Sequence, residues 1–240
     1  MITAVGVVVP ARDERETVGR SVSAVLAALA RLGPEVEPAV CVVADRCTDD
    51  TAQRAFEAGA HVLCNSAEAT IGEVRDIGML YVRALLSRHR PNRTVLLSTD
   101  ADTLVPPAWV TRHVGLVAAG AHAVAGQVRL ADRHRLSSAV ARLYVSVVDG
   151  ARGPQGHGNV YAANLGVRAD AYDAVGGFGA VACGEDHDLW RRLRATGHRC
   201  VYADGLRVTT SGRRQGRAAG GLAALLTLLD EVAGSGGAGE

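Results

Sequence analysis

The chain has 240 residues, of which 48% are hydrophobic and 21% charged, and its formal net charge is +1. This length and composition favour one globular domain with a sizeable core, and the near-neutral charge argues against a dedicated nucleic-acid-binding protein. All 26 basic residues are arginines, so there is no lysine for a phosphate-binding loop or a Schiff base. Anionic ligands must therefore be bound by arginines, backbone N–H groups or a metal.

The cysteines and the apolar runs indicate a cellular location. None of the cysteines forms a C-x-x-C pair, a pattern typical of reduced thiols rather than of a disulfide framework. The first residues lack the basic start and the cleavage site of a signal peptide, and no run reaches the ~18 apolar residues that a membrane span needs. We therefore expect a cytoplasmic protein without an integral membrane segment. The cysteines are Cys41, Cys47, Cys64, Cys183 and Cys200.

Strand and helix patterns alternate in the first half of the chain. Short β-branched runs predict strands, and apolar residues at helical spacing predict helices between them. Asp13 is the expected N-cap of the first helix. The alternation predicts an α/β fold with a mostly parallel sheet and helices on both faces. The expected strands are 5–9, 39–44, 61–64 and 95–98, and the expected helices begin near 18, 48, 72 and 106.

The rhythm changes after about residue 120. A strand over 121–130 is followed by an amphipathic segment over 136–148 and a glycine-rich loop over 150–158. The segment and the loop are expected to shape a pocket for a second substrate. A helix over 185–195, two short strands near Cys200 and Val208 and an arginine-rich loop over 211–217 complete the expected elements.

Acidic residues follow the predicted strands directly. Asp13, Asp45, Asp100 and Asp102 each lie just past a strand end, where parallel sheets bind their ligands. Asp100 and Asp102 are one residue apart and can both approach one hard cation, which favours Mg²⁺ or Mn²⁺. The two carboxylates could instead satisfy N–H groups of a turn, but their place after a buried strand favours the metal.

Six short motifs follow one another over residues 5–200: Pro10–Glu14, Ala44–Asp49, Thr99–Asp102, Ala163–Gly166, Gly176–Phe178 and Gly184–Leu189. With these motifs in this order, the sequence resembles the family-2 glycosyltransferases of the GT-A fold, which implies a single GT-A-like globule. The change of rhythm along the chain predicts a nucleotide-sugar-binding half over 1–102 and an acceptor-side half over 103–232 of this globule. The glycine-rich end predicts a disordered tail over 233–240.

The resemblance implies contacts to the nucleotide. Asp45 would accept the N–H of the base, which favours a UDP- or dTDP-sugar donor, and Glu14 would lie near the ribose. Arg75 would face the diphosphate. Independently of the resemblance, Arg213 and Arg214 of the arginine-rich loop could either be solvated or add bidentate contacts to the diphosphate. The other residues expected at the donor are Pro10, Ala11, Arg12, Asp100 and Ala101. Arg46 and Cys47 stand where small residues are usual, which implies a nucleoside pocket of different shape.

The resemblance also implies a mechanism. Asp102, with Asp100, would be the ligand of Mn²⁺ or Mg²⁺, and Asp186 the general base that deprotonates an acceptor hydroxyl, with inversion at the anomeric carbon. Asp188 lies about 200° around the same helix and should point elsewhere. His187 could join the metal site or be structural. A sugar-nucleotidyltransferase and a catalytically silent nucleotide-binding module remain alternatives, and neither the donor sugar nor the acceptor follows from the sequence.

Overall fold

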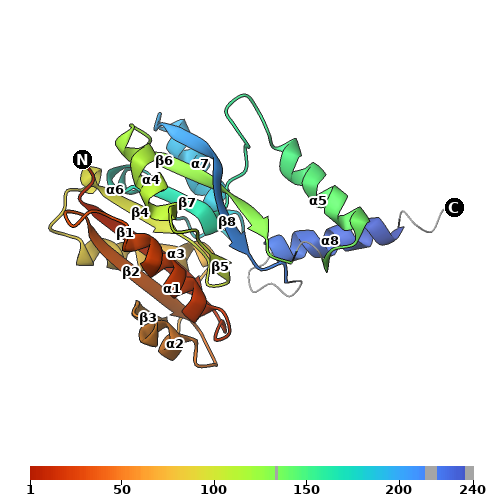
Figure 1. Cartoon of the computed structure of the whole chain (residues 1–240), viewed down its shortest axis with the longest axis horizontal. Helices are drawn as coiled ribbons and strands as arrows, with labels where there is room; N and C mark the ends of the chain where they lie inside the picture. Colours follow the sequence, from red (N-terminus) through yellow and green to blue (C-terminus); the bar gives the residue numbers. More distant parts are fainter. Residues whose placement is uncertain (133–134, 214–220, 236–240) are drawn as a thin grey trace.

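The apolar runs of the first half form four neighbouring parallel strands of one sheet in the computed structural model (Figure 1). The structure describes residues 1–132, 135–213 and 221–235. The four strands lie side by side in the order β3-β2-β1-β4, and every neighbouring pair is parallel. The strands are β1 (Ala4–Ala11), β2 (Glu37–Asp45), β3 (His61–Asn65) and β4 (Thr94–Ser98). Helices α1 (Val18–Leu29), α2 (Thr51–Glu57) and α3 (Ile71–Leu85) connect them, with a short η1 (Pro91–Arg93) before β4.

The second half extends this sheet to eight strands in the order β3-β2-β1-β4-β7-β6-β8-β5. It adds β5 (Thr103–Leu104), β6 (Ala123–Leu130), β7 (Leu165–Arg168) and β8 (Cys200–Thr210). Strand β7 is antiparallel to both β4 and β6, and β5 is antiparallel to β8, whereas β6 and β8 are parallel. The sheet is therefore mixed, and its continuous run of four parallel strands, β3-β2-β1-β4, is the half that the alternation predicted.

One strand, β8, replaces the two short strands expected near Cys200 and Val208. It runs over eleven residues but changes register against β6, where Ala125 pairs with Tyr202 and Gln127 with Arg207. The four intervening residues of β8 bulge out of the ladder, and Gly205 takes a φ of +78° there. A left-handed backbone favours glycine, and a bulge interrupts the two-residue alternation that the sequence shows.

Helices cover both faces of the sheet, as expected for this class of fold (Figure 1). Side chains of β1 alternate between the two faces, with Val5, Val7 and Val9 in one core and Val8 in the other. The first core includes side chains of α1 and α4 (Trp109–Ala118), and the second includes side chains of α3, α6 (Ala169–Ala174) and α7 (Glu185–Ala195). Because neighbouring side chains of β1 point to opposite faces of the sheet, this strand contributes to both cores, and each core packs against its own layer of helices.

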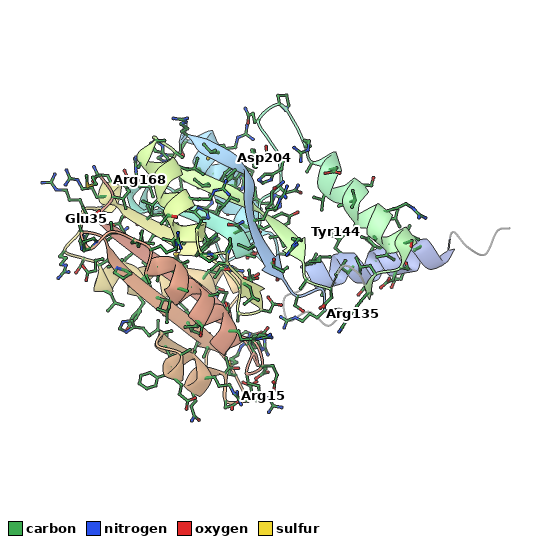
Figure 2. The ribbon with its side chains drawn as sticks, in the orientation of Figure 1. Arg15, Glu35, Arg135, Tyr144, Arg168 and Asp204 are labelled. Atoms are coloured by element: carbon green, nitrogen blue, oxygen red, sulfur yellow. The ribbon has the colours of Figure 1, made fainter. Side chains whose placement is uncertain are left out.

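Helices α5 (Ser138–Gly150) and α8 (Leu222–Ser235) pack on each other and extend away from the sheet (Figure 1). They share a third apolar cluster that includes Tyr144 of α5, drawn in Figure 2, and Leu226 of α8. The sequence did not predict α8. This helix continues to Ser235, so the first residues of the tail expected over 233–240 are helical, and the last five lie outside the described residues.

One helix cap and two helix starts differ from the sequence prediction. The N-cap of α1 is Thr17 rather than Asp13. Asp13 instead adopts a φ of +51° and accepts a hydrogen bond from the backbone N–H of Thr48 at 2.7 Å. Helix α2 begins at Thr51 rather than near residue 48, and α4 begins at Trp109, after Pro106 and Pro107. Across the ranges that the structure describes, no helix combines the length and the apolar character needed to cross a membrane.

Candidate active site

The carboxyl ends of β1, β2 and β4 bring the predicted acidic residues to one edge of the sheet. In register, Ala11 of β1 lies beside Ala44 of β2, and Val8 lies beside Ser98 of β4. Asp45, the last residue of β2, therefore lies at the same edge as the segments after β1 and β4 that carry Glu14 and Asp100. This is the edge at which parallel sheets bind ligands.

Arg75 organises one side of this edge. The residue is 4% exposed, and its guanidinium donates to Asp100 Oδ1 at 2.6 Å, Ser98 Oγ at 2.8 Å and Glu185 Oε1 at 3.2 Å. One side chain thus joins α3, the end of β4 and the start of α7. This geometry favours a role for Arg75 in positioning Asp100, and its expected contact with a diphosphate stays a prediction.

Replacing Arg75 with methionine is expected to lower the free energy of unfolding by about 3–5 kcal/mol, because Glu185 would remain buried without its partner. Arg83→Met is a matched control in the same helix, since Arg83 pairs with the more exposed Asp173. The control should cost less than about 1 kcal/mol. Urea denaturation of both variants measures the difference, and equal losses would contradict the assigned role of Arg75.

Asp102 lies deeper than Asp100, with 11% of its side chain exposed. Its Oδ1 accepts a hydrogen bond from Thr210 Oγ1 at 3.2 Å, and its Oδ2 lies 3.4 Å from Nη2 of Arg213. Burial, and then the negative charge of Asp100, raise the pKa of Asp102 to about 6. Removing Asp102 from water beside other carboxylates makes its anionic form costly, and a bound cation would relieve that cost.

The carboxylates of this site fit a hard divalent cation. Asp100 uses Oδ1 for Arg75, while a third of its side chain is exposed, and Asp102 and Glu14 supply further oxygens close by. Oxygen ligands of this kind are what Mg²⁺ and Mn²⁺ prefer. Asp102 and Asp100 are the residues that would hold the ion.

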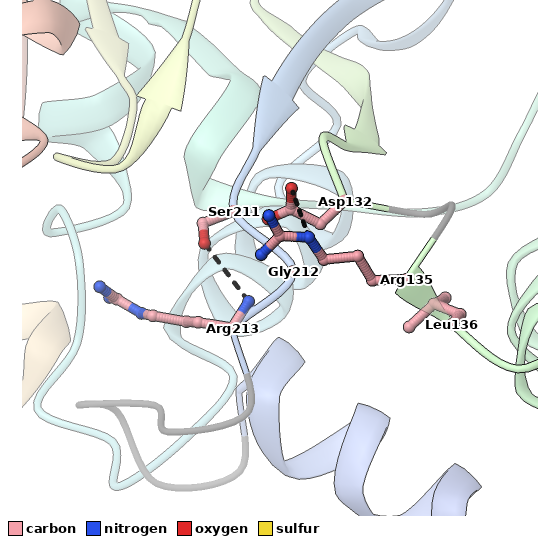
Figure 3. A pocket seen from close by; sticks show the side chains of 6 residues that line it. All are labelled: Asp132, Arg135, Leu136, Ser211, Gly212 and Arg213. Atoms are coloured by element: carbon pink, nitrogen blue, oxygen red, sulfur yellow. Dashed lines mark hydrogen bonds and ion pairs between the residues drawn. The ribbon is translucent and has the colours of Figure 1, made fainter.

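Arg213 lies in the segment after β8 and contacts the acidic residues of the site. Its Nη2 lies 2.6 Å from Glu14 Oε1 and 3.4 Å from Asp102 Oδ2, so it bridges the loop after β1 and the loop after β4. Arg213 also borders a hollow of about 390 Å³ that Figure 3 shows from close by, with Asp132 and Arg135 facing each other. The structure thus places Arg213 beside Asp102, the expected metal ligand, and Arg214 lies outside the described residues.

The residues expected at the nucleoside lie in or after β1 and β2. Glu14 is buried and accepts a hydrogen bond from Thr17 Oγ1 at 2.8 Å, while Asp45 is buried and accepts one from Asn65 Nδ2 at 2.8 Å. Arg46, with a φ of +46°, lies 3.4 Å from the Asp45 carboxylate. Pro10 and Ala11 are buried in β1, Arg12 is exposed and Ala101 is buried. Their contacts with a nucleotide stay predictions.

Asp186 lies in the first turn of α7, half-buried. Its Oδ2 accepts a hydrogen bond from the backbone N–H of Ala162 at 2.9 Å, and its Oδ1 accepts one from the N–H of His187 at 2.8 Å. Asp188 instead pairs with Arg191 and Arg192 at 2.6 and 2.8 Å, so it points away from Asp186 as expected. His187 is exposed.

Sequence reasoning missed four partners of the expected residues. Arg75 donates hydrogen bonds to Ser98 and Glu185. Asp102 accepts one from Thr210, and Asp45 accepts one from Asn65. Only Glu185 carried a local signal, because it is the neighbour of Asp186 in a motif already singled out. The other three become visible only when the strands are paired.

A second acidic group lies beside the nucleoside end of the site. Single ligand atoms of Asp13, Cys47 and Asp49 lie within 4.8 Å of one another. Asp13 already accepts hydrogen bonds from Thr48, and Asp49 accepts one from the backbone N–H of Thr51 at 3.0 Å. These bonds explain the group as a stabiliser of the turn before α2.

Comparison with known proteins identifies the family. A family model described as glycosyltransferase-like family 2 matches residues 3–224. The chain belongs to this glycosyltransferase family. The match spans strands β1 to β4, the two aspartates after β4 and the start of α7, and it confirms the resemblance that the six motifs indicated. The comparison with curated protein sequences gave no significant match.

Solved glycosyltransferase structures share the fold. The mannosyltransferase of Pyrobaculum calidifontis in complex with GDP-Man and Mn²⁺ is 14% identical, with a TM-score of 0.63 over 88% of this chain and 58% of that one. Glucosyl-3-phosphoglycerate synthase of Mycobacterium tuberculosis, in complex with Mn²⁺, UDP-Glc and phosphoglyceric acid, is 19% identical, with a TM-score of 0.56 over 96% of this chain and 80% of that one. The family-2 chain thus spans 58% of the length of the mannosyltransferase.

Proposed function

We propose that this family-2 glycosyltransferase transfers a sugar from a nucleoside-diphosphate donor to an acceptor hydroxyl and requires a divalent metal. The observation that carries the proposal is the link that Arg75 makes between Asp100 and Glu185, the neighbour of Asp186. One buried side chain holds the expected metal-binding loop and the expected base-bearing helix together. The fold neighbours support it, since two of them were solved with a nucleotide sugar and Mn²⁺.

Each side chain has a defined task in this proposal. Asp186 takes the proton of the acceptor hydroxyl as its oxygen attacks the anomeric carbon, and a single displacement inverts the configuration. A divalent ion held by Asp102 and Asp100, Mn²⁺ or Mg²⁺, would stabilise the negative charge on the departing diphosphate. Arg213, whose guanidinium already lies at Asp102, adds a second positive charge on that side.

Asp45 is expected to select the base. It is buried and fixed by Asn65, so it can accept an imide N–H from uracil or thymine. UDP or dTDP should therefore bind more tightly than ADP, by about 1.5–3 kcal/mol for a charge-assisted hydrogen bond. GDP stays possible, because guanine also has an imide-like N–H.

Competition titrations with UDP, dTDP, GDP and ADP measure this preference. Asp45→Ala should remove it, whereas Asp50→Ala, at an exposed ion pair with Arg54, should preserve it. Tighter binding of ADP than of UDP to the wild-type protein would refute the role of Asp45.

A thermal-shift screen of nucleotide sugars, with Mn²⁺ and with EDTA, tests the proposed function. A donor stabilises the folded protein in proportion to its occupancy, so the true donor should raise the midpoint most and only with metal. A silent binding module would show the same shift without turnover, and a sugar-nucleotidyltransferase would release pyrophosphate. The proposal includes a cytoplasmic location, which the five unpaired cysteines support.

A further inference from the structure

A hollow of about 290 Å³ lies between the end of α5 and the outer parts of β6 and β8. Its polar lining consists of Gln127, Arg129, Asn159, Tyr161 and Arg207. Asn159 donates to the carbonyl oxygen of Val148 at 2.9 Å, which fixes the wall that α5 contributes. The hollow is separate from the one beside Arg213, with which it shares no lining residue.

Two positive charges in this lining have neutral partners. Arg207 donates through Nε to Gln127 Oε1 at 2.9 Å, and Arg129 donates through Nη2 to Thr209 Oγ1 at 3.3 Å. Neither guanidinium forms an ion pair with a carboxylate within the described ranges 1–132, 135–213 and 221–235. Each is therefore oriented by a neutral group while its remaining N–H groups stay available.

The strand register brings the two arginines together. Gln127 lies opposite Arg207, and Arg129 lies opposite Thr209, so the two guanidinium-bearing residues are diagonal neighbours on adjacent strands. Alternation places both on the same face of the sheet. Paired guanidinium groups that are not neutralised bind phosphate or carboxylate through charge-assisted, bidentate hydrogen bonds.

The hollow reaches the segment that contacts the expected base. Its lining residue Tyr161 precedes Ala162, whose N–H donates to Asp186 at 2.9 Å. Burial and then neighbouring negative charges, including that of Asp186, raise the pKa of Tyr161. A molecule held in this hollow would therefore lie next to the expected base.

We propose that Arg129 and Arg207 bind an anionic group, a phosphate or a carboxylate, of the acceptor whose hydroxyl Asp186 deprotonates. This inference rests on the proposed function and adds the chemical class of the acceptor. The anion sits between the two guanidinium groups, with Gln127 and Asn159 as neutral neighbours that select polar ligands.

Isothermal titration of glycerol phosphate, glycerate and glycerol tests the anion site. These probes share a hydroxyl-bearing three-carbon frame and differ in the charged group. Titrations are run with UDP and Mn²⁺ present, on the wild-type protein, on the double variant Arg129→Gln/Arg207→Gln and on Arg31→Gln. Both target arginines and Arg31 are exposed, and Arg31 lies after α1 outside the site, so all variants should fold like the wild type.

Glycerol phosphate is expected to bind the wild type and Arg31→Gln alike, and the double variant roughly ten-fold more weakly or worse. Comparable binding of glycerate assigns the site to either anion, and binding of glycerol phosphate alone assigns it to phosphate. Equal binding of glycerol, unchanged binding in the double variant, or no binding to the wild type would overturn the inference. UDP, dTDP and GDP titrated with Mn²⁺ into the same variants separate the two proposals, since absence of binding of all three nucleotides to the wild type would refute the donor site instead.

Discussion

Asp186→Asn is expected to lower turnover by roughly 10²–10⁴ while donor affinity stays within about a few-fold. Asparagine keeps the oxygen that accepts the Ala162 N–H at 2.9 Å, so the start of α7 should hold its position. It cannot take a proton from the acceptor hydroxyl. The effect should therefore fall on kcat and not on the binding of the nucleotide, which steady-state kinetics and titration measure separately.

Asp188→Asn is the matched control for Asp186. It lies two residues further along α7 and pairs with Arg191 and Arg192, so it should leave turnover and donor affinity unchanged. NMR of the product should show an inverted anomeric configuration. Full activity of Asp186→Asn, or a retained configuration, would reject this mechanism while leaving the donor site intact.

Asp102→Ala is expected to abolish the effect of metal on nucleotide binding. In the wild type, Mn²⁺ or Mg²⁺ should strengthen the binding of a nucleoside diphosphate, because Asp102 and Asp100 are proposed to hold an ion that would neutralise the phosphates. Without Asp102, calorimetry should give the same affinity in Mn²⁺ and in EDTA. Asp132→Ala is the control. This substitution changes the hollow of Figure 3 but leaves Asp100 and Asp102 in place, so the metal dependence should be kept.

The same site should respond to pH. The pKa of Asp102 is raised to about 6 by burial and by Asp100, and only the ionised carboxylate ligates a metal. The strengthening by Mn²⁺ should be fully present well above pH 6 and should fade as the pH falls through about 6. Equal affinity in Mn²⁺ and EDTA across this range in the wild type would show that the metal assignment is wrong.

Elements that are determined by neighbouring residues in the sequence could be predicted from the sequence alone. Helix α7 begins and ends where the sequence predicted, because Gly184 adopts a left-handed φ of +75° before it and acids fill its first turn. Strands β1, β2 and β4 were predictable because their buried, β-branched runs have few other stable conformations in a sheet covered on both faces.

Contacts between distant segments were not predictable from one sequence. Arg75 and Glu185 are 110 residues apart, and Thr210 and Asp102 are 108 apart, so only the packing of helices and strands in the folded chain reveals these contacts. Helix α8 was missed for a related reason. Its apolar face packs in a small cluster with α5 and Leu130 at the end of β6, and these partners lie about 70–100 residues earlier in the sequence, so no local pattern marks α8 as part of the fold.

Chromatography of the nucleotide products tests the central assignment. The protein would be incubated with UDP-, dTDP- and GDP-sugars, with Mn²⁺ or EDTA, and with glycerol phosphate and water as acceptors. We expect one donor to yield its nucleoside diphosphate only with Mn²⁺, at a rate that falls to background in Asp102→Ala. Release of pyrophosphate, diphosphate formation that is equal in EDTA, or no diphosphate above the Asp102→Ala background from any donor would contradict a metal-dependent glycosyltransferase.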